Sequence, residues 1–186
     1  MLSLPAPAKL NLFLHITGRR ADGYHELQTV FQFIELQDTI HLEIRPDKRI
    51  RRITAWPEVA AENDLMVRAA RLLAHHSGVS AGVDIRFEKH IPMGAGLGGG
   101  SSDAATVLCG LNLLWGLNLP LSMLVDIGLE LGADVPVFIH GHAAWAEGTG
   151  NLLSSIDPPE PYYLVIVPPV HVSTAKIFSH PTLTRD

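Results

Sequence analysis

The feature that most constrains the fold is a glycine-rich segment followed directly by a helix-forming sequence. Residues 94–100 contain five glycines, Ser101 and Ser102 come next, and apolar residues then recur as far as Trp115. Glycine adopts positive φ at little steric cost, so such a loop can turn several backbone N–H groups toward one point. The helix that follows adds its own free N–H groups and the positive end of its dipole. The segment therefore predicts a site for a polyphosphate.

Two common phosphate-binding loops do not fit this segment. It lacks the Gly-Lys-Ser/Thr ending of a Walker A loop. Gly94, Gly96 and Gly99 have the spacing of a dinucleotide-binding motif, but residues 111–119 offer no acid for a ribose. The segment also follows residues 89–92 rather than running straight off a buried parallel strand. A flexible linker is the remaining alternative, and the apolar helix directly after the loop argues against it.

The rest of the chain mixes strand and helix patterns without the regular alternation of a doubly wound sheet. Gln37 and Asp38 are predicted to form a hairpin turn, and residues 132–138 are predicted to lead into strands. We therefore expect an α+β fold with a mixed or antiparallel sheet and helices packed on one face. Strands are predicted at 9–16, 29–36, 39–45, 82–89, 143–147 and 162–167, and helices at 64–76 (capped by Asn63 or Asp64), after the glycine loop, at 122–131 and at 174–178.

Composition excludes several classes of protein. The 14 basic and 19 acidic residues give a net charge of −5, whereas a nucleic-acid binder needs a basic face. No apolar run reaches the roughly 20 residues that span a membrane, and residues 1–18 do not resemble a signal peptide. Cys109 is the single cysteine, and the histidines form no zinc motif, although His140 and His142 are expected to share a strand face. We expect a cytoplasmic protein with no dedicated metal site, no nucleic acid partner and no membrane partner.

Phosphoryl transfer also needs a group that deprotonates the acceptor and a cation that balances charge. Asp134 is the candidate base, and we expect it at the edge of an apolar strand, where a carboxylate needs a partner. Lys9 and Asn11 share the polar face of the first predicted strand, so Lys9 is the candidate partner that keeps Asp134 ionised. From spacing alone, a turn-capping role for Asp134 and a surface position for Lys9 remain equally open.

Four separated motifs, in this order, resemble those of the GHMP kinases. They are PAKLNL at 7–12, RADGYH at 20–25, PMGAGLGGGSSDAA at 92–105 and LGADVP at 131–136. The third is similar to the central loop of the whole superfamily. The other three, together with the triple glycine, narrow the resemblance to the family of the 4-diphosphocytidyl-2-C-methyl-D-erythritol kinases.

The resemblance implies transfer of the γ-phosphate of ATP, with Mg²⁺, to the 2-hydroxyl of 4-diphosphocytidyl-2-C-methyl-D-erythritol, a step in the non-mevalonate route to isoprenoid precursors. It implies Lys9 and Asp134 as the catalytic pair. It implies Asn11 and Thr174 near the substrate, and Tyr24, His25 and Phe178 around the cytosine. The residues that it implies for ATP are Leu65, Pro92, Met93, Gly94, Ala95, Gly96, Leu97, Gly98, Gly99, Gly100, Ser101 and Ser102.

The resemblance also implies a domain organisation. Residues 1–160 would form the GHMP kinase N-terminal domain, which resembles domain 2 of ribosomal protein S5, and residues 161–186 would begin the connection to a C-terminal domain that is missing here. Relatives usually carry Asn where Asp64 stands. Asp103 and Glu130 are possible Mg²⁺ ligands. Two alternatives stay open: another GHMP kinase, of the mevalonate or homoserine type, or a catalytically incomplete nucleotide-binding fragment.

Overall fold

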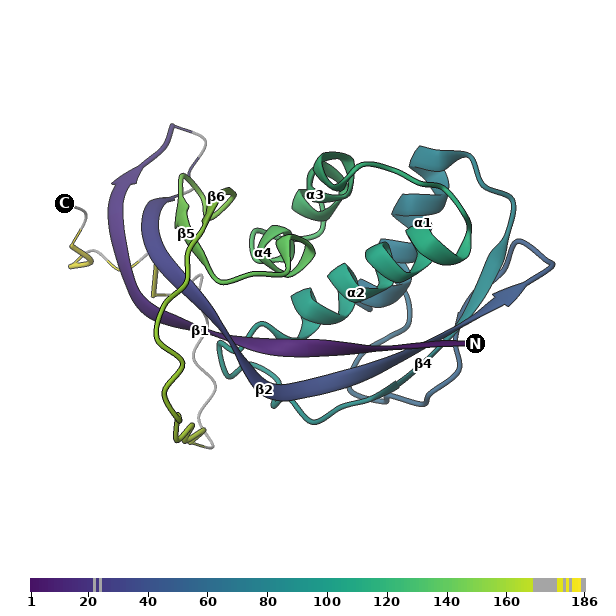
Figure 1. The fold of residues 1–186 in the computed structure, drawn as a ribbon, viewed down its shortest axis with the longest axis horizontal. Coiled ribbons are helices and arrows are strands. Elements are labelled where there is room, and N and C mark those ends of the chain that lie inside the picture. The colour runs from purple at the N-terminus through teal and green to yellow at the C-terminus, as the bar shows by residue number, and fades with distance from the viewer. Residues whose placement is uncertain (22, 24, 169–176, 179, 181, 185–186) are drawn as a thin grey trace.

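A computed structural model covers the chain and describes residues 1–21, 23, 25–168, 177–178, 180 and 182–184. In this described part, helices lie over one face of a six-stranded sheet (Figure 1). The predicted α+β fold is confirmed. The elements in chain order are β1 (Leu2–Arg19), β2 (His25–Arg45), β3 (Ile50–Arg52), α1 (Leu65–Ser77), β4 (Gly82–Glu88), α2 (Gly99–Leu114), α3 (Leu121–Leu129), α4 (Val135–His140), β5 (Ala144–Glu147) and β6 (Leu152–Ser155).

Strand β2 is the centre of the sheet. One of its edges pairs with β1 over the whole length of both strands, from Leu2 opposite Leu42 to Arg19 opposite His25. Its other edge pairs first with β5 and then with β4, both antiparallel. Strands β3 and β4 pair in parallel, so the sheet is mixed.

The predicted hairpin turn at Gln37 and Asp38 is wrong, because β2 runs straight through both residues. The polar pair lies beside an irregularity in the ladder, where the partners shift between Pro7 and Ala8. Asp38 is fully buried, and its carboxylate accepts hydrogen bonds from the backbone N–H groups of His90 and Ile91. A polar residue that looks like a turn signal is therefore a buried anchor for a distant segment.

The main core lies between the sheet and the helices. Asp64 caps α1 by accepting a 2.8 Å hydrogen bond from the Met66 N–H, and the helix ends at Gly78 in the left-handed region, which confirms the predicted helix and its cap. No helix in the described residues has the length and apolar character needed to cross a membrane. Large side chains that are fully buried include Ile40, Leu42 and Ile85 from the sheet and Met66, Leu73, Leu108 and Leu111 from the helices.

Residues 135–140 form helix α4, so the prediction that they lead into strands is wrong. The run Val-Pro-Val-Phe-Ile has strand-like composition, but Pro136 suits the first turn of a helix and Gly141 ends it at φ 76°. Val135 is fully buried in the main core with residues of α2 and α3, and Val137 is fully buried against Phe31 of β2 and Ala144 and Ala146 of β5. Asp134 therefore stands at the start of a helix, and not at the edge of a strand.

The histidines that follow also differ from expectation. His140 is the last residue of α4, so His140 and His142 do not share a strand face, although their rings meet edge to face at 5.9 Å. His140 Nε2 lies 2.8 Å from Ser155 Oγ on β6. Burial, and to a smaller extent His142, lowers the pKa of His140.

The predicted strand at 162–167 is also wrong, since these residues adopt no regular secondary structure. Their side chains do alternate between contact with the rest of the protein and exposure to solvent. Tyr163 Oη donates to Gln32 Oε1 at 3.3 Å and Val165 packs on a small apolar cluster, whereas Tyr162 and Leu164 are exposed. A period of two is thus present without any partner strand among the described residues. Of the helix predicted at 174–178, residues 174–176 lie outside the described part, and the domain boundary at 160 stays a prediction.

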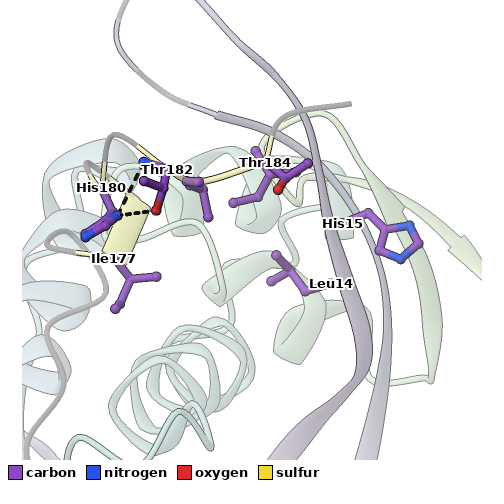
Figure 2. A pocket seen from close by; sticks show the side chains of 8 residues that line it. Leu14, His15, Ile177, His180, Thr182 and Thr184 are labelled. Atoms are coloured by element: carbon purple, nitrogen blue, oxygen red, sulfur yellow. Dashed lines mark hydrogen bonds between the residues drawn. The ribbon is translucent and has the colours of Figure 1, made fainter.

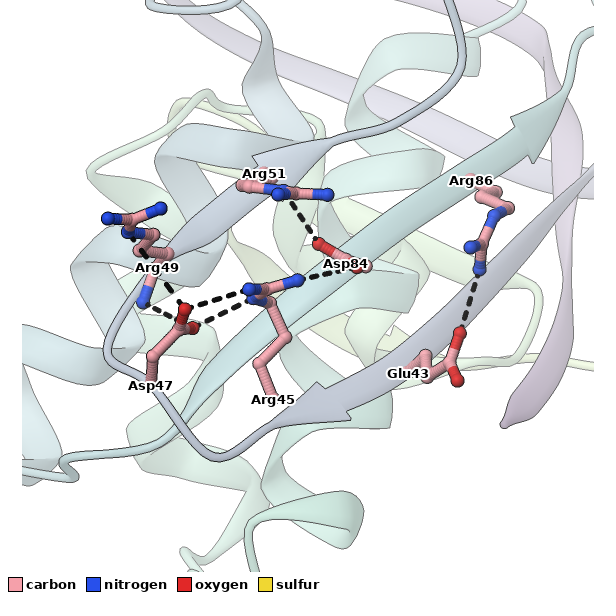
Figure 3. Close-up of polar contacts among 7 residues, drawn as sticks. All are labelled: Glu43, Arg45, Asp47, Arg49, Arg51, Asp84 and Arg86. Carbon is pink, nitrogen blue, oxygen red and sulfur yellow. Dashed lines mark hydrogen bonds and ion pairs between the residues drawn. The ribbon is translucent and has the colours of Figure 1, made fainter.

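The arginines at the end of β2 and in β3 belong to an ion-pair network on the sheet (Figure 3). Arg45 pairs with Asp47 at 2.7 Å and with Asp84 at 2.9 Å, and Arg51 pairs with Asp84 at 3.1 Å. The hydrogen bonds from Arg45 lower the pKa of Asp47 to about 2. Acids on β2, β4 and the connecting loop therefore neutralise much of this positive charge.

Candidate active site

The glycine-rich segment connects the end of β4 to the start of α2. Ile91 and Leu97 are buried at its two ends and belong to one apolar cluster with Ala8. The residues between them, from Pro92 to Gly96, are largely exposed. Leu97 is tied to the sheet because its carbonyl accepts a 2.9 Å hydrogen bond from the backbone N–H of Lys9. The loop is thus fixed at both ends, with its middle open to a ligand.

The backbone of the loop and of the first turn of α2 suits an anion. Gly94, Gly96 and Gly98 have φ of 69°, 75° and 75°, the alternating positive φ expected of a nest of N–H groups. Gly98 is the N-cap of α2 and no side chain caps this end, so the N–H groups of the first turn remain available. The buried hydroxyl of Ser102 has no hydrogen-bond partner among the described atoms. This arrangement can hold phosphate groups.

Side chains from other elements surround this cradle. A Cβ placed on Gly100 would lie 3.5 Å from Cδ1 of Leu65, so the first residue of α1 borders the first turn of α2. A Cβ on Gly98 would lie 3.2 Å from Cε of Lys9 and 2.7 Å from Cζ of Phe138. The structure therefore brings the predicted ATP residues of the loop, Leu65 and Lys9 into one region.

Replacing Gly98 by Ala is expected to disrupt this region far more than replacing Gly96. Both glycines have φ of 75°, so both substitutions carry the backbone strain of about 1–2 kcal/mol. Only at Gly98 would the new methyl group collide with a ring, whereas at Gly96 nothing lies within 4 Å. Overpacking adds roughly 1–3 kcal/mol. Thermal unfolding and titration with Mg·ATP should show a larger loss for Gly98→Ala, and equal losses in the two variants would contradict the geometry.

Lys9 and Asp134 meet beside the cradle, with Nζ 3.4 Å from Oδ2. The Lys9 side chain is only 6% exposed and the Asp134 side chain is 41% exposed, so the cation is enclosed while the carboxylate is open to a ligand. Lys9 Nζ also donates a 2.6 Å hydrogen bond to Asn11 Oδ1 and lies 5.4 Å from the centre of the Phe31 ring. Asp134 thus presents an accessible carboxylate next to an enclosed positive charge.

A short hydrogen-bond chain on β1 and β2 orients Asn11. Its Nδ2 donates to Thr29 Oγ1 at 2.8 Å, and the Thr29 hydroxyl donates to the carbonyl of Phe13 at 2.5 Å. Because the amide nitrogen of Asn11 is occupied in this way, its oxygen faces Lys9. Thr29, which is fully buried, was not singled out from the sequence, since a threonine in a strand pattern has no distinguishing signal.

The residues predicted to hold the substrate base lie at the far end of the same pair of strands. His25 begins β2, and its ring stacks on that of Phe178 with centroids 5.3 Å apart and planes at 24°. His25 and Phe31 are six positions apart on β2, roughly 20 Å along an extended strand. Tyr24 and Thr174 lie outside the described residues.

A cavity of about 820 Å³ lies between β1 and described residues of the C-terminal segment, from Ile177 to Thr184 (Figure 2). Its walls are mainly apolar or uncharged. Two polar atoms of the lining are hydrogen-bonded to each other, since His180 Nδ1 lies 2.8 Å from Thr182 Oγ1. The lining residues are Leu14, His15, Ile16, Ile177, His180, Thr182, Leu183 and Thr184.

The residues considered as metal ligands have other partners. Asp103 Oδ2 accepts a 2.7 Å hydrogen bond from Lys89, and Glu130 lies 3.0 Å from His76.

Asp64 is 2% exposed, and its second oxygen accepts from Arg52 at 2.9 Å, so both of its carboxylate oxygens already have partners within the protein. Among the described residues, no three His, Cys, Asp or Glu side chains gather as a metal site.

Comparisons with known proteins agree with this geometry. Residues 64–142 match the GHMP kinases N terminal domain family. All of the chain aligns with the curated 4-diphosphocytidyl-2-C-methyl-D-erythritol kinases of Pseudomonas syringae pv. tomato, at 60% identity over 66% of that protein, and of Methylococcus capsulatus, at 58% identity over 64% of it. The chain thus spans just under two thirds of the length of these relatives.

Solved structures give the same result. A crystal structure of 4-(cytidine 5'-diphospho)-2C-methyl-D-erythritol kinase superposes with a TM-score of 0.74 at 41% identity, over 85% of this chain and 56% of that one. The mevalonate kinase of Methanococcus jannaschii, at 16% identity and a TM-score of 0.62 over 84% of this chain and 56% of that one, shows the shared fold alone. The chain therefore belongs to the GHMP kinases, in the family of the 4-diphosphocytidyl-2-C-methyl-D-erythritol kinases.

Proposed function

We propose that the chain binds ATP and 4-diphosphocytidyl-2-C-methyl-D-erythritol and transfers the γ-phosphate to the 2-hydroxyl of the sugar alcohol. The observation that carries the proposal is the position of the Lys9–Asp134 pair directly beside the glycine-rich cradle. An acceptor hydroxyl held at Asp134 would face a phosphate held by the loop and the start of α2.

Each part of the reaction has a residue to perform it. Asp134 Oδ takes the proton of the 2-hydroxyl, and the freed oxygen forms a bond to the γ-phosphorus while the bond to the β-phosphate oxygen breaks and ADP leaves. Lys9 pairs with the Asp134 carboxylate and balances the negative charge that develops between the reactants. The N–H groups of the loop stabilise the phosphates, and the enclosed position of Lys9 strengthens its electrostatic effect.

Mg²⁺ would enter with ATP, because this cation is usually held by substrate phosphates together with very few protein groups. Ser102, whose hydroxyl in the first turn of α2 has no partner among the described atoms, is the residue that would fit as a protein group beside this cation. The cation would neutralise phosphate charge during transfer.

The stacked rings of His25 and Phe178 support a cytidine-linked substrate in particular. A base inserted at these rings gains stacking of roughly 1–3 kcal/mol per aromatic face, by analogy with nucleic-acid binding. The separation from Lys9 along β1 and β2 requires an elongated ligand, with a base at one end and an alcohol at the other. Mevalonate and homoserine carry no base and would leave the rings unused. Tyr24 and Thr174 remain part of the proposed substrate site, and the cytoplasm is the proposed location.

The test is phosphorus NMR of the 186-residue chain with ATP, Mg²⁺ and 4-diphosphocytidyl-2-C-methyl-D-erythritol. We expect a new phosphomonoester signal together with the signals of ADP. The same experiment with mevalonate should leave ATP unchanged. Phosphorylation of mevalonate instead would overturn the substrate assignment. No new signal from folded protein would show that these residues are not a complete enzyme.

A further inference from the structure

We propose that Lys89, held between Asp38 and Asp103, is a positioning residue that fixes both ends of the glycine-rich loop in its phosphate-binding shape. This inference rests on the proposed function for the identity of the ligand, but not for the effect on the loop. Lys89 and Asp38 lie outside the four motifs that carry the resemblance, whereas Asp103 lies near the end of the third motif. Together they form the main buried charge cluster beneath the loop.

The first end of the loop is anchored by Asp38 from the centre of β2. One carboxylate oxygen accepts hydrogen bonds from the backbone N–H groups of His90, at 2.5 Å, and Ile91, at 2.9 Å. The other oxygen accepts from Lys89 Nζ at 2.5 Å. Asp38 is fully buried, so these charge-assisted bonds have no competition from water. They fix the backbone immediately before Pro92, where the loop becomes exposed.

The second end is anchored by Asp103 in the first turns of α2. Its Oδ2 accepts a 2.7 Å hydrogen bond from the same Lys89 ammonium, and Asp103 is 1% exposed. Lys89 therefore joins the strand before the loop, the centre of the sheet and the start of the helix after the loop. The Trp56 ring, whose centre is 5.7 Å from Nζ, covers the cluster.

A loop so rich in glycine needs such an external connection. Glycine loses more conformational freedom on ordering than any other residue, so a free loop would spend much of its binding energy on becoming ordered. Fixing both ends beforehand lowers that cost, and a preorganised loop binds its ligand more tightly. The middle of the loop has few buried contacts of its own, so its order depends on these two ends.

The test compares Lys89→Met with Arg86→Met. Both substitutions remove a cation from the same stretch of chain, but Arg86 forms a separate ion pair with Glu43 on the surface of the sheet (Figure 3). We expect the amide hydrogens that hold the two ends of the loop, those of His90, Ile91 and Lys9, to exchange about tenfold faster in Lys89→Met, with exchange in α3 unchanged. Calorimetric titration should show the Kd for Mg·ATP rising by a similar factor. Arg86→Met should change neither quantity.

Two outcomes separate this proposal from the proposed function. Unchanged loop exchange in Lys89→Met would overturn the proposal, whatever the protein binds. Faster loop exchange in a protein whose wild type does not bind Mg·ATP would support the positioning role and contradict the proposed function. Should Lys89→Met fail to fold, Asp103→Asn decides the matter, because the amide occupies the same space but removes the carboxylate charge that pairs with Lys89. Loop exchange should then rise several-fold, and no rise would overturn the proposal.

Discussion

Replacing Asp134 by Asn is expected to lower kcat by at least about 10²-fold, the loss typical for removal of a general base. The amide cannot take the proton of the acceptor hydroxyl. Binding of Mg·ATP should persist, because the loop and the start of α2 keep their backbone N–H groups. Stability should change little, since the Asp134 carboxylate is 41% exposed and its pairing with Lys9 is worth at most about 1 kcal/mol after solvent screening. Steady-state kinetics and calorimetric titration measure the two effects separately.

Asp126→Asn is the matched control for this variant. Asp126 is an exposed acid on neighbouring α3, so the same change of charge is made outside the site. Its kcat should equal that of the wild type. Turnover near the wild-type value in Asp134→Asn would contradict the assignment of the base. A parallel loss of ATP binding would place Asp134 in the nucleotide site instead.

Local patterns in the sequence were sufficient for the parts of the site that depend on local chemistry. The glycine loop and the following helix are both determined by residues close together in the chain, and Asp64 caps α1 as its position suggests. The alternation around Lys9 correctly puts its side chain on the same face of β1 as that of Asn11, but this face is the covered one, since Lys9 is 5% exposed whereas Leu12 and Leu14 are each 42% exposed. The pairing of Lys9 with Asp134 could be proposed because both residues belong to motifs with known chemistry.

The errors occur where distant contacts decide the structure. Asp38 resembles a turn residue, and only contacts with Lys89, His90 and Ile91, more than fifty positions away, make it tolerable inside a strand. The apolar run of α4 is compatible with a strand or a helix, and packing on α2 and α3 selects the helix. A buried acid in the middle of an apolar strand pattern is the signal that could have revealed the cluster beneath the loop.

The second large effect is expected in the pH dependence of stability of Asp103→Asn. Burial raises the pKa of Asp103 to about 7, and nearby Asp38 adds to the increase, although Lys89 opposes it. Two backbone N–H groups and Lys89 all donate to the Asp38 carboxylate, whereas Asp103 accepts from Lys89 alone among the described residues. Burial opposes the charge on Lys89, but the two carboxylates outweigh burial and raise the pKa of this lysine.

The sign of the effect follows from where the proton resides. Between about pH 4 and 7 the folded protein holds a proton on Asp103 that the unfolded chain has released, so the free energy of unfolding falls as pH rises. Asp103→Asn removes this fall. At about 1.4 kcal/mol per pKa unit, the free energy of unfolding of the variant should rise by up to roughly 4 kcal/mol relative to that of the wild type between pH 4 and 8. Urea unfolding at a series of pH values measures this change.

Asp47→Asn provides the contrast, because the pKa of Asp47 is lowered to about 2 by its hydrogen bonds with Arg45. Its stabilising effect is lost only as pH falls below 4, so its difference from the wild type should stay constant between pH 4 and 8. A constant difference for Asp103→Asn as well would contradict the raised pKa. If Asp103→Asn is more stable than the wild type at pH 8 and also has a looser glycine loop, then the ionised carboxylate of Asp103 orders the loop at a cost in stability. A purely structural residue would not behave in this way, because its replacement would loosen the loop and lower stability together.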